Sequence, residues 1–280
     1  MNMKRTLISL IAILCVSLTA SAAQKRILVS TAEEFINALG SNREIVVINE
    51  EGLLLTPAIQ NMADRGKLKK FDRWSRARQE GVMYEPDTDG PQLIIAGFKN
   101  LTICGNSPER ERIEVTPRYV NVLTFISCED IALEDLYLGH TDEGYCSNGV
   151  VGFDDCHNVR IKNCGLFGCG TEGIELRQSS EFTMTDSEIF HCSYYIMHLF
   201  GSKNCTFQNC AFYNNKEFEQ VSVDADCENV LYDHCVFTGN EGTLFNFYNN
   251  RNVLLRRCII QHAGEMGNGL ESFENCIFVN

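Results

Sequence analysis

The chain has 280 residues, and its 24 lysine and arginine residues against 37 aspartate and glutamate residues give a formal net charge of −13 at pH 7. This acidity argues against nucleic acid or an anionic membrane surface as a partner, because both carry negative charge themselves. With 44% hydrophobic and 22% charged residues the chain is also too apolar to be intrinsically disordered, so we expect one folded, elongated domain.

Residues 1–23 have the pattern of a signal peptide. Lys4 and Arg5 precede an apolar run over residues 7–18, which is followed by the small residues 20–23. The apolar run is too short to span a membrane. We therefore expect export to the periplasm, the cell surface or the medium, with no transmembrane segment after cleavage.

Residues 24–56 are predicted to form an N-terminal cap and a first turn of strands. A short helix is expected from Ser30 or Thr31 to Gly40, because a capping residue begins this segment and a glycine ends it. We expect this helix to close the open end of the sheets behind it, which would otherwise be prone to edge-to-edge association. Two apolar stretches, 43–48 and 52–55, are the expected strands of the first turn.

Residues 57–92 form a charged insertion that interrupts the pattern on either side. It contains Trp74, the single tryptophan of the chain, and a group of basic residues: Arg65, Lys67, Lys69, Lys70, Arg73, Arg76 and Arg78. A basic segment on an acidic protein could bind a polyanion. We favour the alternative, a solvated and partly helical insertion packed on the flank of the domain.

Residues 93–280 contain an internal repeat. A phrase such as Asn158-Val-Arg-Ile-Lys-Asn-Cys164 recurs, and the second residues of successive copies are separated by 23, 23, 25 and 23 residues: Val159, Phe182, Cys205, Val230 and Val253. A fixed period of this size is typical of a solenoid. Because apolar and polar residues alternate within each period, we expect strands rather than helices.

Each period predicts three short strands, for example at 159–161, 164–166 and 174–176. Three strands per turn without an intervening helix indicate a single-stranded parallel β-helix, in which like residues stack on like residues about 4.8 Å apart. Polar residues should then form a ladder at one corner of the stack: Asn100, Asp130, Asn158, Glu181, Asn204, Asn229 and Asn252.

On the repeat N-[VI]-x-[IL]-x-N-[CS]-x-[FIL], the chain resembles the right-handed parallel β-helix superfamily that includes pectate lyases and polygalacturonases. The resemblance covers residues 93–280 and implies an all-β, right-handed single-stranded parallel β-helix with a short N-terminal capping helix. It leaves the activity open, because the superfamily contains lyases, hydrolases, esterases and non-catalytic adhesins. Gly139-His140 and Asp154-Asp155 echo polygalacturonase motifs but lack their order and spacing.

Thirteen of the 14 cysteines remain after signal cleavage. Several recur at one inward position of the repeat, where cysteine serves as a small buried apolar residue: Cys164, Cys210, Cys235, Cys258 and Cys276. We therefore predict mostly buried thiols. Cys169 and Cys192, expected 23 residues apart at an outward loop position, are the best candidates for a disulfide, and with His191 they form a weak zinc candidate that we do not adopt.

The third strand of each period predicts two outward rows. One row consists of Gly152, Glu175, His198, Ser222 and Asn246, and the next of Asp154, Arg177, Phe200, Asp224 and Tyr248. Acidic, basic and aromatic side chains on one face are typical of a sugar-binding groove. The candidates for catalysis are Glu175, Arg177, His198, Asp154 and Asp224, and those for substrate binding are His140, Asp142, Glu172, His191, Tyr194, Tyr195 and Phe200.

The sequence therefore predicts an exported β-helix protein that recognises carbohydrate on one outer face, with catalysis left open. The first alternative is a polysaccharide lyase or glycoside hydrolase acting on an acidic polysaccharide, with Ca²⁺ required for a lyase and no other cofactor or metal expected. The second is a non-catalytic assembly protein, which would use the open last coil at 276–280 for self-association.

Overall fold

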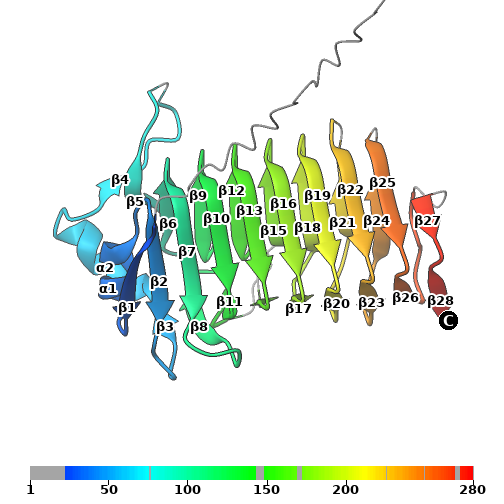
Figure 1. Cartoon of the computed structure of the whole chain (residues 1–280), viewed down its shortest axis with the longest axis horizontal. Helices are drawn as coiled ribbons and strands as arrows, with labels where there is room; N and C mark the ends of the chain where they lie inside the picture. The colour runs from blue at the N-terminus through cyan, green and yellow to red at the C-terminus, as the bar shows by residue number, and fades with distance from the viewer. Residues whose placement is uncertain are drawn as a thin grey trace, which may run out of the picture.

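The computed structural model describes residues 23–75, 77–142, 148–168, 172–224, 226–248, 250–268 and 272–279. The expected signal peptide lies outside this range except for Ala23. The described chain winds into an elongated stack of coils, with two helices at the N-terminal end and β27 (Phe273–Glu274) and β28 (Ile277–Val279) at the C-terminal end (Figure 1). Each complete coil contributes one strand to each of three sheets, A, B and C, as the repeat predicts.

Sheet A contains ten parallel strands in the described part of the chain: β1 Lys25–Val29, β2 Arg43–Val47, β7 Lys99–Gly105, β10 Glu129–Glu134, β13 His157–Lys162, β16 Ser180–Thr185, β19 Lys203–Gln208, β22 Glu228–Asp233, β25 Arg251–Arg256 and β27 Phe273–Glu274. The first phrase of every repeat lies in this sheet. Strand β1 was not predicted, and it pairs with β2 as an additional strand at the N-terminal edge.

Sheet B contains nine parallel strands among the described residues: β3 Leu53–Leu54, β8 Glu111–Val115, β11 Leu136–His140, β14 Gly165–Phe167, β17 Glu188–Phe190, β20 Ala211–Tyr213, β23 Val236–Thr238, β26 Ile259–Gln261 and β28 Ile277–Val279. At the C-terminal end of the sheet, Ile277 and Phe278 are exposed.

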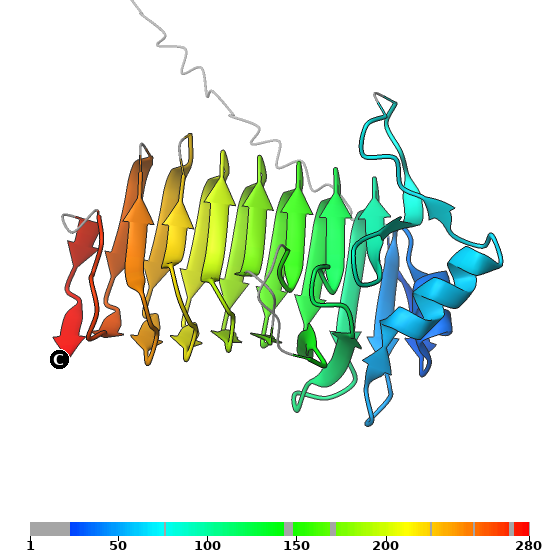
Figure 2. The same ribbon diagram turned by 180° about the vertical axis from the view of Figure 1, so that it is seen from behind.

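Sheet C, which carries the predicted outward rows, also has nine described strands: β4 Lys69–Lys70, β5 Gly81–Pro86, β6 Pro91–Ala96, β9 Leu123–Ile126, β12 Val151–Asp154, β15 Glu172–Arg177, β18 Tyr195–Phe200, β21 Glu219–Val223 and β24 Thr243–Phe247. β4 and β5 pair in parallel with each other, and β5 pairs antiparallel with β6, so these two strands run opposite to the other described strands of the sheet. The insertion thus folds back and extends this sheet at its N-terminal edge (Figure 2).

The two helices close the N-terminal end of the core. Helix α1 (Ala32–Ala38) begins with the predicted capping box, in which Thr31 accepts a hydrogen bond from the Glu34 amide and Glu34 accepts one from the Thr31 amide. Helix α2 (Leu55–Asp64) packs against α1 and buries Ile59 and Met62. The helical part of the insertion therefore contributes to the end cap, which the sequence assigned to α1 alone.

The predicted corner ladder is present. The corner residues that follow the repeat spacing have φ between 54° and 58°, the left-handed region that asparagine tolerates better than most residues. Their side chains bond from coil to coil: Asn229 Nδ2 donates to Asn204 Oδ1 at 3.0 Å, and Asn252 Nδ2 donates to Asn229 Oδ1 at 2.8 Å. The same asparagine residues therefore adopt the left-handed backbone conformation at the corner and form side-chain hydrogen bonds between coils.

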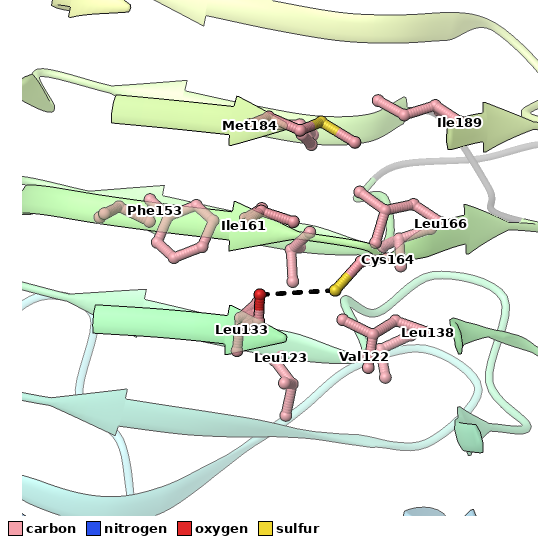
Figure 3. Close-up of a cluster of buried hydrophobic side chains, with 14 of the residues drawn as sticks. Val122, Leu123, Leu133, Leu138, Phe153, Ile161, Cys164, Leu166, Met184 and Ile189 are labelled. Carbon is pink, nitrogen blue, oxygen red and sulfur yellow. Dashed lines mark hydrogen bonds between the residues drawn. The ribbon is translucent and has the colours of Figure 1, made fainter. Parts of the chain in front are cut away.

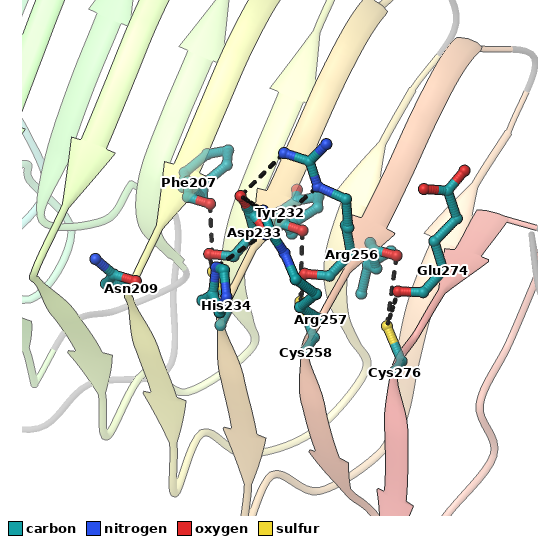
Figure 4. A network of polar contacts seen from close by, with 12 residues as sticks. Phe207, Asn209, Tyr232, Asp233, His234, Arg256, Arg257, Cys258, Glu274 and Cys276 are labelled. Carbon is teal, nitrogen blue, oxygen red and sulfur yellow. Dashed lines mark hydrogen bonds and ion pairs between the residues drawn. The ribbon is translucent and has the colours of Figure 1, made fainter.

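A second corner ladder, between sheets A and B, was only partly foreseen. Asn163 turns the chain as predicted and donates to Asp135 Oδ1 at 2.6 Å. Further along, Arg257 occupies this corner, and its Nη2 atom donates to Asp233 Oδ2 at 2.6 Å, while Arg256 Nη2 donates to the same oxygen at 3.0 Å (Figure 4). Burial acts to raise the pKa of Asp233, but the two guanidinium groups outweigh it and lower this pKa to about 2.

The core is filled by inward-facing rows that stack along the axis, as expected from the period. The rings of Phe125 and Phe153 stack at 5.0 Å, and those of Phe207 and Tyr232 at 4.9 Å. Thiols line one core row, where Cys164 Sγ donates to the carbonyl oxygen of Leu133 in the previous coil at 3.5 Å (Figure 3). Free thiols are found at Cys104, Cys128, Cys156, Cys164, Cys205, Cys210, Cys227, Cys235, Cys258 and Cys276.

Two predictions from the repeat were wrong: Cys192 was expected to point outward, and Phe247, which the alternation directs inward, was expected to be fully buried. Cys192 does not lie at an outward loop position but is fully buried, because its backbone turns into the core and its amide donates to Asn215 Oδ1 at 2.9 Å. Its proposed disulfide partner, Cys169, lies outside the described residues. Phe247 is only partly buried, because it lies near the open C-terminal end of the stack.

Candidate functional site

The outward rows of sheet C stack as the sequence predicted. Glu175 in β15 pairs in register with Gly152 in β12 on one side and with His198 in β18 on the other. The row continues through Ser222 to Asn246. In the adjacent row, Arg177 lies between Asp154 and Phe200, with its guanidinium 5.6 Å from the centroid of the Phe200 ring.

A cleft of about 320 Å³ lies on this face, between sheet C and the insertion. One wall comes from the insertion and β5, through Phe71, Arg73 and Glu85. The opposite wall comes from the predicted rows, through Asp154, Glu175 and Arg177. The floor is formed by side chains near the N-terminal ends of the strands: Gln92, Asn121, Thr124 and Asn148.

Ion pairs fix both guanidinium groups of the cleft. Arg73 donates from Nε and Nη2 to the two carboxylate oxygens of Glu85, each at 2.7 Å, and these bonds raise the pKa of Arg73. Gln92 Nε2 also donates to Glu85, at 2.7 Å. Across the cleft, Arg177 Nε donates to Glu175 Oε1 at 2.6 Å. The two-point contact between Arg73 and Glu85 holds the guanidinium plane of Arg73 in one orientation.

Amide groups line the floor, where Asn121 is buried. Asn121 Nδ2 donates to Thr124 Oγ1 at 3.0 Å, and its Oδ1 accepts from the Gly149 amide at 2.7 Å. A β-carbon on Gly152 would lie 2.6 Å from Asn121 Nδ2, so this position of the outward row needs a glycine. Gly152 was predicted to lie in the outward row, but its close contact with Asn121 was not foreseen.

Asp154 and Glu175 are the two carboxyl groups that β12 and β15 place on the cleft wall. Desolvation by the cleft walls raises the pKa of Asp154, and the nearby Arg177 opposes this. Asp154 still reaches solvent at the cleft wall. Glu175 differs in environment, since its carboxylate is held in the ion pair with Arg177.

A second polar cluster follows the cleft along the same face. His198 Nε2 lies 2.9 Å from Asp224 Oδ2, and Ser222 Oγ donates to Asp224 Oδ1 at 3.0 Å. The Tyr195 ring stacks beside the His198 ring at a centroid distance of 5.7 Å. His198, Asp224, Tyr195 and Phe200 are therefore brought together as predicted, but they lie beyond the residues that line the cleft.

Glu172 lies in register with Tyr195 at the start of β15. It is 5% exposed, and its carboxyl group makes no hydrogen bond or ion pair with any residue that the structure describes. Burial, followed by the negative charge of Glu175, raises the pKa of Glu172 to about 8. Glu172 is therefore protonated at neutral pH and can act as a hydrogen-bond donor.

Four predicted binding residues do not join this face. His140 is buried at the end of β11 in sheet B, where its Nε2 atom lies 2.8 Å from the Val120 carbonyl oxygen, so it is not a surface ligand. Asp142 is exposed two residues beyond it. His191 follows β17 in sheet B and packs edge-on against Phe190, whereas Tyr194 contacts Phe218.

The zinc alternative cannot be followed to Cys169, which lies outside the described residues. Within the described ranges there is no group of three or more His, Cys, Asp or Glu side chains placed to hold a metal ion. The same residues include no helix that is long and apolar enough to cross a membrane.

Several cleft residues were missed because they lie outside the repeat or at unmarked positions of it. Arg73 and Glu85 belong to the insertion, whose fold the period does not predict. Asn121 precedes β9 and Gln92 is the second residue of β6, so neither lies at a position of the outward rows. The single tryptophan of the insertion and the glycine at position 152 of an outward row were the available signals.

Comparison with known proteins supports the architecture. Residues 143–280 match the family described as "Right handed beta helix region". A pectate lyase, Bsp165PelA from Bacillus sp. N165, solved with trigalacturonate, is 13% identical with a TM-score of 0.56 and coverage of 92% of this chain and 83% of its own. A pectate lyase (pelN) from Paenibacillus sp. 0602 is 10% identical with a TM-score of 0.52 and coverage of 88% and 72%.

A surface adhesin, PfbA of Streptococcus pneumoniae, is 11% identical with a TM-score of 0.48 and coverage of 91% of this chain and 72% of its own. No curated protein sequence matches the chain. At these identities the structural likenesses concern the fold alone. Together, the family match and the two pectate lyase structures support a right-handed parallel β-helix fold for this chain.

Proposed function

We propose that this protein recognises carbohydrate in the cleft between sheet C and the insertion. The observation that carries the proposal is the composition of the cleft, which combines fixed arginine–carboxylate pairs with amide groups on its floor. Sugar hydroxyl groups both donate and accept hydrogen bonds, so a wall that offers guanidinium donors beside carboxylate and amide acceptors suits them.

The rim of the cleft adds aromatic surface. Phe71 lines the cleft from the insertion, and Phe200 continues the outward row beside Arg177. Aromatic rings bind the apolar faces of pyranose rings while the hydroxyl groups reach polar partners. The trigalacturonate held by one pectate lyase of similar fold is consistent with a glycan as the ligand class.

The charge of the cleft alone does not select an acidic sugar. Arg177 is neutralised by Glu175, and Arg73 by Glu85. These pairs favour hydroxyl recognition over the binding of a free carboxylate. A preference for uronic acids therefore needs a cation outside the cleft.

A glycan array followed by calorimetry tests the proposal. Glu175→Ala and Arg177→Ala should each weaken binding of the best glycan by about tenfold or more, since each leaves its partner's charge unpaired. Arg160→Ala is the matched control, because Arg160 is an exposed arginine on the outer face of sheet A. Absence of binding to every glycan on the array would overturn the proposal and favour the assembly alternative.

Cleavage of the bound glycan is the second candidate, favoured by the unlike environments of Asp154 and Glu175. Glycoside hydrolysis uses one carboxylic acid to protonate the leaving oxygen and one carboxylate to activate water or attack the sugar. The raised pKa of Asp154 suits the acid, and the ion-paired Glu175 suits the carboxylate.

Product analysis separates the reaction classes. A hydrolase releases reducing ends without ultraviolet absorbance, and this release should be lost in Asp154→Asn while glycan binding remains. A lyase instead yields unsaturated uronides that absorb in the ultraviolet, and we predict that this reaction would require Ca²⁺ and stop with a chelator. Binding without either product would support recognition alone.

Export accompanies this function as a proposal. The pattern of residues 1–23 supports it, and polysaccharides of cell walls and matrices are met outside the cytoplasm. Mass determination of the protein recovered from the medium or periplasm should place the mature N-terminus near residue 24. Recovery of the full-length chain in the cytoplasm alone would contradict export.

A further inference from the structure

The most exposed large apolar side chain of the described residues is Trp74, at 89%. Trp74 belongs to the segment that joins β4 to β5 within the insertion. Leaving an indole ring in water forgoes the favourable free energy of burying its apolar surface. Exposed aromatic surface of this size beside polar groups is typical of a binding site.

Trp74 lines a second cavity of about 440 Å³. The other lining residues are Lys70, Phe71, Asp72, Arg73, Glu85 and Pro86. Phe71, Arg73 and Glu85 also line the cleft described above, so the two spaces share a wall. A glycan chain that leaves the cleft on this side therefore passes along the insertion.

Hydrogen bonds within the insertion hold the segment around Trp74. The Trp74 amide donates to Asp72 Oδ1 at 3.1 Å. Gln79 returns across the segment, because its Nε2 donates to the Asp72 carbonyl oxygen at 2.7 Å and its Oε1 accepts from the Asp72 amide at 3.0 Å. A backbone fixed in this way presents the indole with little ordering left to occur on binding.

The two cationic side chains that line this cavity, Lys70 and Arg73, differ in whether a carboxylate of the protein already pairs with them. Arg73 is matched by Glu85. Lys70 is exposed, and its ammonium group forms no ion pair with any residue in the described part of the chain. An unmatched ammonium group beside an exposed indole suits a sugar that carries a carboxylate.

We propose that this second cavity binds one uronic acid unit of a polysaccharide, with its ring on Trp74 and its carboxylate on Lys70. The inference rests on the proposed carbohydrate function and adds to it the chemical class of the ligand. The acidic preference then comes from the insertion, while the cleft with its paired charges holds the adjoining units.

The single tryptophan gives a direct measurement, because its fluorescence reports on this site alone. Hexagalacturonate, hexamannuronate and the neutral cellohexaose are titrated into the full protein, with tryptophan emission and calorimetric heat recorded in parallel. We expect at least one uronic acid hexamer to release heat and to change the emission, and cellohexaose to bind about fivefold more weakly or not at all.

Variants assign the effect to the two side chains. Trp74→Ala should weaken binding of the uronic acid hexamer about tenfold, and Trp74→Phe by less because a ring remains. Lys70→Gln should weaken it about fivefold, whereas Lys69→Gln, the adjacent exposed lysine that does not line the cavity, should change it less than twofold.

Each contrary result has a distinct meaning. Heat without an emission change, together with unaltered affinity of Trp74→Ala, overturns this site and leaves the proposed function standing. Equal affinity for cellohexaose and the acidic hexamers overturns the uronic acid assignment. Absence of heat with both uronic acid hexamers overturns this site, and if the glycan array is also empty the proposed function falls with it.

Discussion

The imidazole of His198 and the carboxylate of Asp224 join two successive coils, with Nε2 of His198 2.9 Å from Oδ2 of Asp224. The carboxylate is itself held by the Ser222 hydroxyl, and Tyr195 packs on the imidazole ring. His198 is therefore fixed in orientation at the C-terminal side of the cleft. The pair is 25% and 31% exposed, which limits but does not remove its contribution to stability.

This contact predicts energetic coupling between the two residues. In a double-mutant cycle of His198→Ala and Asp224→Ala, urea unfolding should give a coupling energy of about 1 kcal/mol. His198→Ala combined with Asp186→Ala, a corner residue of another face, should be additive. Additivity in the first pair as well would mean that the hydrogen bond contributes nothing to the folded state.

Ile174→Asp should destabilise the fold by about 3–5 kcal/mol, because Ile174 is fully buried between Val151 and Met197 and the new carboxylate would have no partner there. Thermal unfolding provides the measurement. Thr183→Asp, on an outer row of sheet A, is the control and should change stability little. A parental melting temperature for Ile174→Asp would contradict the register of sheet C.

Most cysteines should resist alkylation in the native protein. Burial raises the pKa of Cys164 to about 12 and that of Cys104 to about 11, so little thiolate forms near pH 8. Cys276, half-buried in the last coil, should react first.

Mass spectrometry after alkylation in denaturant without reductant should label more than half of the thirteen mature cysteines, whereas a single labelled site would indicate a disulfide framework.

Glu172→Gln should stabilise the protein at pH 8 but not at pH 5. The pKa of Glu172 is raised from 4.5 to about 8 on folding, so the folded state holds a proton that the unfolded chain releases between these values. Stability therefore falls as the pH rises through this interval, and a neutral glutamine removes the loss, with a gain of about 1 kcal/mol or more at pH 8.

The measurement is the difference in unfolding free energy between the glutamine variant and the parent at both pH values. Glu109→Gln, which replaces an exposed glutamate, serves as the control and should show no such dependence. Equal stability differences at pH 5 and pH 8 for Glu172→Gln would show that Glu172 is ionised in the folded state.

The coil architecture followed from the sequence because its determinants are local and repeated. Alternation directs Ile161, Ile174 and Leu176 inward, and each period places like residues in register with those of the next coil. The corner asparagines follow from the same period, because a residue that must adopt positive φ recurs at one position. The stacking of Glu175 on His198 was predictable for this reason.

The prediction failed where the chain leaves the alternation. Cys192 and His140 lie at the ends of sheet B strands, where the backbone turns toward sheet C. There the alternation of inward and outward residues no longer predicts the side-chain direction. Both are buried there. The imidazole of His140 therefore contacts a backbone carbonyl oxygen and does not face a ligand.

The sequence by itself determined the β-helix, its inward rows and the order of the polar side chains along sheet C, since alternation and stacking require only nearest-neighbour contacts. The cleft was decided by tertiary structure alone. Arg73 and Glu85 reach Asp154 and Glu175 only because β5 folds back antiparallel on β6 and places the insertion beside the outward rows. That contact joins residues about 70–100 positions apart in a segment without a period, so no local pattern encodes it.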